Sequence, residues 1–303
     1  MKSILKCQNF NESKGISDSC EKITDSIYDT IEPDIIDSIS SFKKFDFNED
    51  DFKLNDIEID YILTKSKENS CNAISNLTTS PKIILNINYN ILNEPFLYYI
   101  KSVIFHEILH VFQHYNLKNK FRPESFSIGS VIPQIRQDIK SKYVNYILDI
   151  LYYSLSHELS AQIHQYYMYK REDKDYSKLK DIIKLLDNFY IKSLDKEENI
   201  ELDFIKTHIL NSIKFYTKNK KYEKDISKSI WIESNREFLN KLSDIIKIKL
   251  KWLYKKIKLV DSKIGIKYDE TFTYYGKLED YQYIDTFNFI KGNLNDCHPI
   301  ENI

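Results

Sequence analysis

A five-residue pattern, His106-Glu107-Ile108-Leu109-His110, constrains this chain more than any other feature of its sequence. Two histidines four positions apart on an α-helix lie one turn above each other, on the same face. Both imidazoles can then reach one metal ion, at about 2.0–2.1 Å each if that ion is zinc. The pattern therefore predicts a helix that supplies two ligands to a metal site.

The flanking sequence predicts that this helix is buried. Glu94-Pro95 marks its start, because proline is favoured in the first turn and an acid is stabilised near the positive end of the helix dipole. Apolar residues then cover much of the helix surface as far as Tyr115, and the polar residues from Asn116 onward end it. The alternative is a core helix whose histidines only satisfy local hydrogen bonds.

A catalytic zinc ion usually has three protein ligands and a water molecule, so a third ligand is needed. His114 falls on nearly the same helix face as His106, but two turns away, which is too far along the axis for one ion. The third histidine of the metzincin pattern would fall at Asn116, and Gln113 replaces the glycine of that pattern. The sequence is therefore not metzincin-like.

A second helix, predicted over residues 138–170 from apolar residues at helical spacing, offers the third ligand. Glu158 is an acid in an otherwise apolar stretch, where a carboxylate usually needs a metal or a cation as its partner. His157 is the competing ligand on the same turn. An ordinary surface acid of an amphipathic helix is the remaining alternative for Glu158.

With these residues the chain resembles the gluzincin branch of zinc metallopeptidases, which includes the thermolysin-like enzymes; the first helix also resembles the zinc helix of clostridial neurotoxin light chains. The resemblance covers the two helices and the strand before them. It implies that His106, His110 and Glu158 hold one Zn²⁺ ion, and it favours Glu158 over His157. It also implies that Glu107 activates a metal-bound water for hydrolysis of a peptide bond.

A peptidase also needs a hydrogen-bond donor for the oxyanion that forms on the substrate carbonyl. Gluzincins use a Tyr or His from the far wall of the cleft. The candidates here are His164, close to Glu158 in sequence, and His208, on a later predicted helix, and a purely structural role is the alternative for each. His114 is a candidate hydrogen-bond partner for a ligand imidazole.

Alternating apolar residues predict strands at 56–62, 71–77 and 82–89. Zincins have an edge strand just before the zinc helix, where an extended substrate pairs by strand addition, and the Asn-lined strand 82–89 is predicted to be that edge. The predicted fold class is α+β and zincin-like, with a small, mostly antiparallel sheet packed on the active-site helices and a mainly α-helical C-terminal half.

The predicted organisation has two parts. Residues 1–172 form a zincin-like catalytic domain, and residues 173–303 form a mainly helical subdomain that provides the other wall of the cleft, with the charged run 171–175 as the boundary. Within the first part, an irregular arm is expected at the N-terminus, followed by a helix bent at a proline. The expected ranges of the remaining elements are 1–15 (arm), 18–42 (bent helix), and 176–193, 201–216 and 227–258 (helices of the second part).

Composition excludes several classes of function. A net charge of −1 excludes a molecule that binds nucleic acid through its overall charge. The four cysteines form no C-x-x-C pair, and no apolar run approaches the length of a membrane span.

The N-terminus does not resemble a signal peptide, so the expected location is cytoplasmic, with release by lysis, within a virion or by dedicated secretion as alternatives. The lysine-rich segment 241–258 fits either an anion-binding face or a solvated helix face.

The sequence thus predicts a zinc metallopeptidase that cleaves peptides or proteins, cell-wall peptides included, and favours an endopeptidase over an exopeptidase. The alternative is a catalytically silent zincin-like structural or binding protein, associated for example with a virion or a cell surface. Intact Glu107 favours activity, because it is the residue that water activation requires.

Overall fold

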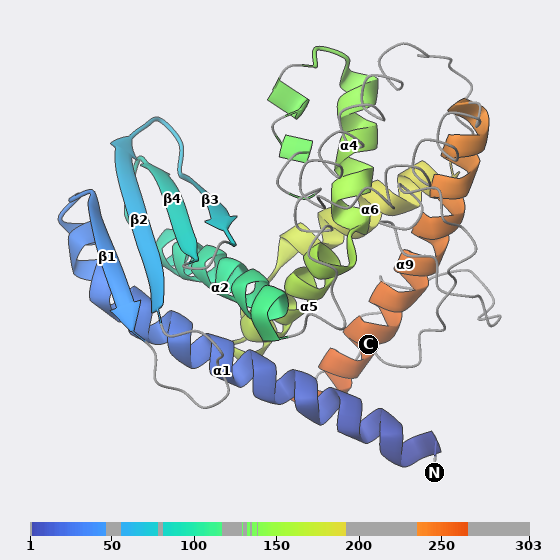
Figure 1. Ribbon diagram of the computed structural model, residues 1–303, viewed down its shortest axis with the longest axis horizontal. Coiled ribbons are helices and arrows are strands. Elements are labelled where there is room, and N and C mark those ends of the chain that lie inside the picture. Colours follow the sequence, from blue (N-terminus) through green and yellow to red (C-terminus); the bar gives the residue numbers. More distant parts are fainter. Residues whose placement is uncertain are drawn as a thin grey trace, which may run out of the picture. The chain divides into compact units, whose positions relative to one another are not determined.

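The computed structural model describes residues 2–46, 56–77, 81–116, 129, 132–133, 135–137, 139–191 and 235–265. These residues fall into two compact units, one within Met1–Phe121 and the other within Arg122–Glu301, called here the N-terminal and C-terminal units. The N-terminal unit contains a small sheet and two helices, and the described part of the C-terminal unit is helical (Figure 1). The fold class is α+β, as predicted.

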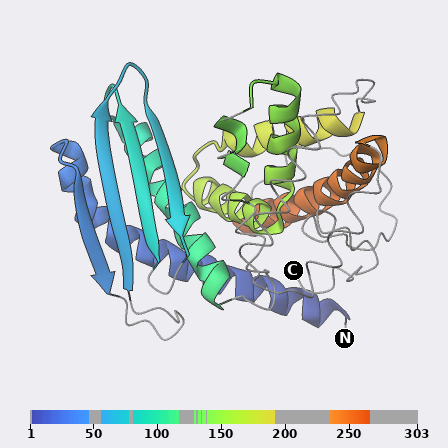
Figure 2. The same ribbon diagram turned by 45° about the horizontal axis from the view of Figure 1, so that its top comes forward.

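The sheet of the N-terminal unit is mixed and has four strands in the order β1-β2-β4-β3. Its strands are β1 (Ser41–Asp46), β2 (Asp56–Lys65), β3 (Ser70–Asn76) and β4 (Lys82–Tyr89). β2 and β4 are parallel, whereas the β1–β2 and β3–β4 pairs are antiparallel. Figure 2 shows the four strands side by side. All three predicted strands are present, and β1 was not predicted.

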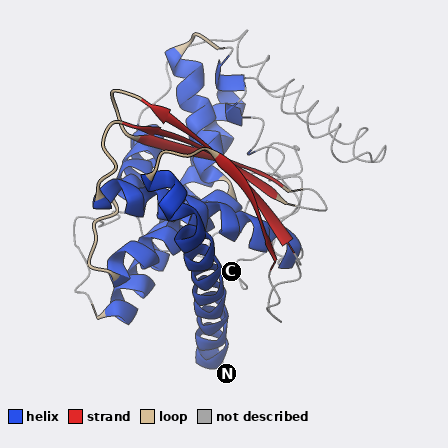
Figure 3. Ribbon diagram, turned by 90° about the vertical axis from the view of Figure 1, so that its left-hand side faces the viewer, coloured by secondary structure: helices blue, strands red, loops and turns tan. Residues whose placement is uncertain are grey.

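On the two central strands, β2 and β4, one face of the sheet is apolar and fully buried, as the period-two pattern of these strands requires. Helix α2 (Glu94–Asn116) packs on β3 and on helix α1 (Lys2–Ile36), so the two helices and this face form the core of the unit. Figure 3 shows the strands and helices in contrasting colours. The fully buried strand residues of this core are Ile57, Ile59, Tyr61, Ile83, Leu85 and Ile87.

The prediction that strand 82–89 is an edge strand was wrong, as the order of the strands shows. β4, which immediately precedes α2 in the sequence, pairs with β2 on one side and with β3 on the other, so it is an interior strand. The edge is β3, the strand before it. The half-buried side chains of Asn86 and Asn88 line the outer face of β4 and not its edge. Alternation reveals which face of a strand is buried, but not which strands flank it.

The first helix differs from its prediction at both ends. It is helical from Lys2, where an irregular arm was expected, and it ends at Ile36 instead of continuing to Phe42. Ser38 has a left-handed backbone (φ 59°), and the amides of Ser38 and Ile39 bond back to the carbonyls of Ile35 and Asp34 at 3.0 and 2.7 Å. This is a Schellman ending, which normally uses glycine. The chain can therefore turn into β1, and Pro33 lies inside the helix without breaking it.

The C-terminal unit packs four described helices against one another. They are α4 (Lys142–Ser154), α5 (Ser156–Arg171), α6 (Ser177–Ile191) and α9 (Asn235–Ile264). The predicted helix 138–170 is thus two helices, separated at Leu155, whose backbone is extended (φ −64°, ψ 132°). Apolar periodicity continues across this break because Leu151, Leu155 and Leu159 are all buried.

The predicted domain boundary at 172/173 differs from the division between the units, because it falls inside the C-terminal unit. α5 and α6 lie on either side of it, and both pack on α9. The charged run is only the turn between these two helices, where Asp173 takes a left-handed conformation (φ 55°). The predicted helix 201–216 lies outside the described residues.

Candidate metal centre

The zinc-helix pattern lies on α2, as predicted, and its two imidazoles face each other. Nε2 of His110 lies 2.9 Å from Nε2 of His106, and the rings meet edge to face with their centroids 4.5 Å apart. Both side chains are buried, with exposures of 8% for His106 and 5% for His110. Two nitrogens on one tetrahedral zinc ion are separated by about 3.3 Å, so the pair needs to open by only a few tenths of an ångström.

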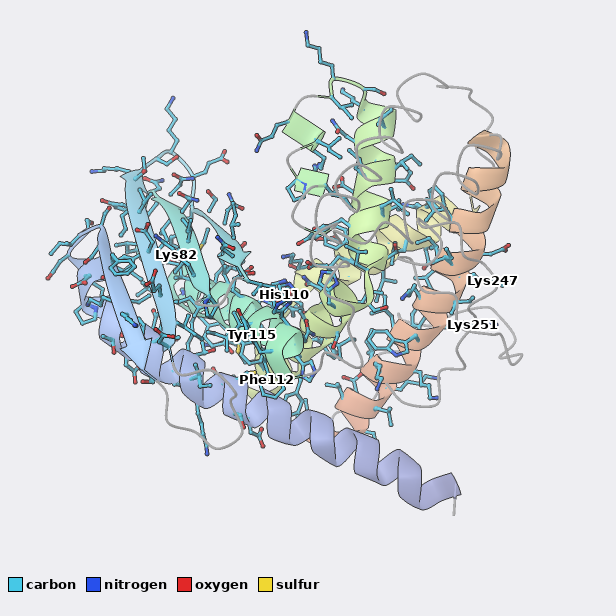
Figure 4. The ribbon with its side chains drawn as sticks, viewed as in Figure 1. Lys82, His110, Phe112, Tyr115, Lys247 and Lys251 are labelled. Atoms are coloured by element: carbon cyan, nitrogen blue, oxygen red, sulfur yellow. The ribbon has the colours of Figure 1, made fainter. Side chains whose placement is uncertain are left out.

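Gln113 fixes the orientation of His110. The Oε1 atom of Gln113 lies 3.1 Å from Nδ1 of His110, one helical turn away, and Gln113 is 2% exposed. A side-chain carbonyl accepts and does not donate, so Nδ1 carries the proton in this contact. The lone pair of Nε2 is then directed toward His106, where a metal ion can use it. Figure 4 labels His110 on α2.

Glu107 is also buried, at 8% exposure. Burial raises the pKa of the Cys71 thiol on β3 to about 12, and the negative charge of Glu107 makes a smaller contribution in the same direction. Cys71 therefore stays protonated at neutral pH and does not compete as a thiolate ligand. The Cys71 side chain on β3 is therefore within electrostatic range of the Glu107 carboxylate.

Glu158 lies in the first turn of α5, and the helix break at Leu155 produces this position. The positive end of the helix dipole favours negative charge at this position, and the Glu158 side chain is only 4% exposed. His157 is 1% exposed, and its Nε2 lies 3.4 Å from Oε1 of Glu158. Burial raises the pKa of Tyr153, and the charges of Asp149 and Glu158 raise it further, so this tyrosine is a neutral hydroxyl close to Glu158.

The ligand atoms of His106, His110 and Glu158 lie within 4.8 Å of one another, and the three residues form a buried group that could hold a metal ion. Two imidazole nitrogens and one carboxylate oxygen match the donor set of a catalytic zinc site, and they also suit other divalent transition metals. The predicted ligand set is thus brought together. His157, the competing ligand, is a neighbour of Glu158 and not a member of this group.

The two predicted oxyanion donors stay predictions. His164 is on α5, six residues after Glu158, which places it roughly 120° around the helix from that carboxylate. Burial, and then the charge of Lys256 on α9, lower its pKa to about 4, so the ring is neutral at pH 7 and has one N–H to donate. His208 lies outside the described residues. His114, the predicted partner of a ligand imidazole, stacks edge to face on Tyr115 with a centroid distance of 4.8 Å.

Sequence reasoning assigned no role in the site to Gln113, Gly129 or Tyr153. An amide three residues after a ligand histidine is a usable signal for Gln113, because residues i and i+3 are neighbours on a helix. Gly129 lies far from Glu158 in the sequence, so only the tertiary fold brings the two together. Tyr153 precedes Glu158 by a few residues, on the other side of the break at Leu155, which no local pattern marks.

Comparisons with known proteins identify no relative: no family model matches the chain, and no curated protein or solved structure is significantly similar to it. In the part of the chain that the structure describes, no helix combines the length and the apolar character needed to cross a membrane.

Proposed function

We propose that this protein is a zinc-dependent peptidase of the gluzincin type, with a zincin-like N-terminal unit. One observation carries the proposal: His106, His110 and Glu158 form a buried group with ligand atoms within 4.8 Å of one another, and the required acid, Glu107, is the neighbour of a ligand on the same helix. A metal site that is only structural usually has four protein ligands and needs no acid beside them.

In this proposal His106, His110 and Glu158 hold the zinc ion. A zinc ion held there would supply Lewis-acid chemistry, which would polarise the substrate carbonyl and make water acidic enough to attack at neutral pH. The Glu107 carboxylate accepts the proton of the attacking water and passes it to the leaving amine. A neutral donor is needed for the oxyanion, and Tyr153 joins His164 and His208 as a candidate, because its hydroxyl keeps its proton near Glu158.

The edge strand supports an endopeptidase. β3 ends the sheet, so its outer edge offers the backbone pairing that an extended peptide uses in strand addition. Cys71 on this strand is electrostatically coupled to Glu107, so a peptide paired along β3 would pass close to the catalytic acid. Strand pairing recognises the middle of an extended chain and needs no free terminus, which favours proteins and cross-linked peptides, including those of cell walls, as substrates.

The test compares Glu107→Gln with Glu94→Gln. Glu107→Gln removes the base and keeps the shape of the side chain, while Glu94→Gln makes the same chemical change at an exposed position at the start of the same helix. Purified wild type and both variants are analysed for bound metal and assayed on casein and on a peptidoglycan panel. We expect one zinc ion per chain in all three proteins, with hydrolysis in the wild type and in Glu94→Gln. Loss of a general base is worth roughly 10²–10⁴-fold in rate.

Two results would contradict the proposal. The first is wild-type protein that binds no zinc even after dialysis against a zinc solution, because this would show that the three residues form no zinc site. Zinc bound equally by wild type and Glu107→Gln, with no turnover by either on any substrate, would favour the second interpretation, a zincin-like binding or structural protein.

A further inference from the structure

Among the described residues of the C-terminal unit, His157 and Gly129 lie close to the Glu158 carboxylate. The first is the ring of His157, whose Nε2 lies 3.4 Å from Oε1 of Glu158. The second is the backbone at Gly129, where an added Cβ would lie 3.1 Å from Nε2 of His157 and 3.6 Å from Oε1 of Glu158. All three residues are buried. A side chain at position 129 would therefore push directly on the His157 ring.

The contact between His157 and Glu158 is not a default of helix geometry. Side chains at i and i+1 on a helix point about 100° apart and do not normally face each other. The ring must turn toward its neighbour to make this contact, and the space for it exists because residue 129 has no side chain. The position of the His157 ring thus depends on how α5 packs against Gly129.

A carboxylate that binds a metal through one oxygen needs its other oxygen fixed, because the terminal torsion of Glu is broad and does not select an orientation. We propose that His157 is a positioning residue for Glu158, donating its Nε2–H to Oε1 so that Oε2 is directed at the metal, and that Gly129 keeps the space in which the ring does this. The inference rests on the proposed function, in which Glu158 is the third metal ligand. It completes a pattern in which Gln113 orients His110 from α2 and His157 orients Glu158 from α5.

The experiment uses the full chain and two substitutions of His157. His157→Gln keeps an N–H donor three bonds from Cβ, as in the imidazole, whereas His157→Leu keeps a similar bulk without any donor. The zinc affinity of each protein is measured by competition with a chromophoric chelator, and the visible absorption of the Co²⁺-loaded protein reports the coordination geometry. We expect zinc binding to weaken roughly 10–100-fold in His157→Leu, with altered Co²⁺ bands. His157→Gln should retain most of the affinity and the wild-type bands.

Gly129→Ala provides an independent variant that leaves the His157 side chain in place. It should weaken zinc binding in the same direction, because the new methyl group displaces the ring. Combined with His157→Leu, it should cause little additional loss, since both changes act through the same contact. The matched control is Gln165→Leu. It removes a buried polar side chain of α5 whose Oε1 atom accepts a hydrogen bond from the Tyr176 hydroxyl at 2.7 Å. This control should lower the stability of the metal-free protein and leave the zinc affinity unchanged.

Two outcomes would overturn the inference alone. One is wild-type zinc affinity and Co²⁺ bands in His157→Leu, and the other is His157→Gln binding as weakly as His157→Leu, since the N–H would then not matter. Glu158→Ala, measured in parallel, separates these from failure of the proposed function. If Glu158→Ala binds zinc as tightly as wild type, Glu158 is not a ligand and both proposals fall.

Discussion

Replacement of Gln113 tests whether the metal centre is prepared by the residues around it. Gln113 is 2% exposed and accepts a hydrogen bond from Nδ1 of His110 at 3.1 Å. The bond exists only when the His110 proton is on Nδ1, which is the tautomer that leaves Nε2 free to bind a metal. Gln113→Leu removes the acceptor and keeps the side-chain bulk, so His110 can adopt the tautomer that blocks metal binding.

The size of the effect follows from the bond that is lost. A neutral buried hydrogen bond contributes about 0.5–1.5 kcal/mol net. All of it acts on metal affinity here, because the bond selects the binding tautomer. An energy of about 1.4 kcal/mol corresponds to a factor of ten in a dissociation constant, so we expect zinc to bind roughly 2- to 12-fold more weakly. Gln113→Glu should bind at least as tightly as wild type, because a carboxylate is a stronger acceptor for the same N–H.

The assay is a chelator competition at pH 7.5, with thermal unfolding of the metal-free proteins to confirm that both variants are folded. A zinc affinity of Gln113→Leu equal to that of wild type would refute the argument. So would an equal loss in Gln113→Glu and Gln113→Leu, because this would show that packing around position 113, and not the acceptor, supports His110.

Three further predictions concern stability. Removal of metal by a chelator should lower the unfolding temperature by roughly 5 °C when zinc was present at about a hundred times its dissociation constant, and in Glu158→Ala this shift should disappear in calorimetry. His164 has a pKa of about 4 in the folded protein, below its value of about 6.5 in the unfolded chain. Between these two pH values the His164 ring is protonated in the unfolded chain and neutral in the folded one, which favours unfolding. Stability should therefore fall between pH 6.5 and 4. Urea unfolding of His164→Gln should show a smaller fall, by at most about 3 kcal/mol, because one pKa unit corresponds to about 1.36 kcal/mol. Ser38→Gly should raise the free energy of unfolding by about 1 kcal/mol, because serine is strained at φ 59°, and Ser40→Gly outside the helix ending should not.

The sequence predicted the elements whose pattern is local and strong. α2 was predicted with nearly the bounds it has, because its start signal at Glu94-Pro95 and its apolar surface agree. β2, β3 and β4 were predicted from alternation alone, which determines the buried face of a strand wherever one side of a sheet is covered. In each of these cases the local preference and the tertiary packing favour the same conformation.

The predictions from the sequence were wrong where the backbone departs from the conformational preference of its residues. Ser38 ends α1 in a left-handed conformation that glycine would have signalled, so β1 was missed. Leu155 is extended although leucine favours helices, so one helix was predicted where there are two. The order of the strands was a third failure, since pairing between β2 and β4 joins segments that no local pattern connects.

The error at Leu155 matters for function. In an unbroken helix Glu158 would lie far from either end, where the backbone amides are already bonded and offer nothing to a buried carboxylate. The break makes Glu158 part of a first turn, with the positive end of the helix dipole beside it. The same break places His157 in that turn, next to the carboxylate it contacts at 3.4 Å. The sequence could nominate Glu158 because an acid in an apolar stretch needs a partner, but what stabilises its charge depends on where the backbone bends. At Leu155 the helical preference of the residue conflicts with its extended backbone, and such conflicts are expected at functional sites.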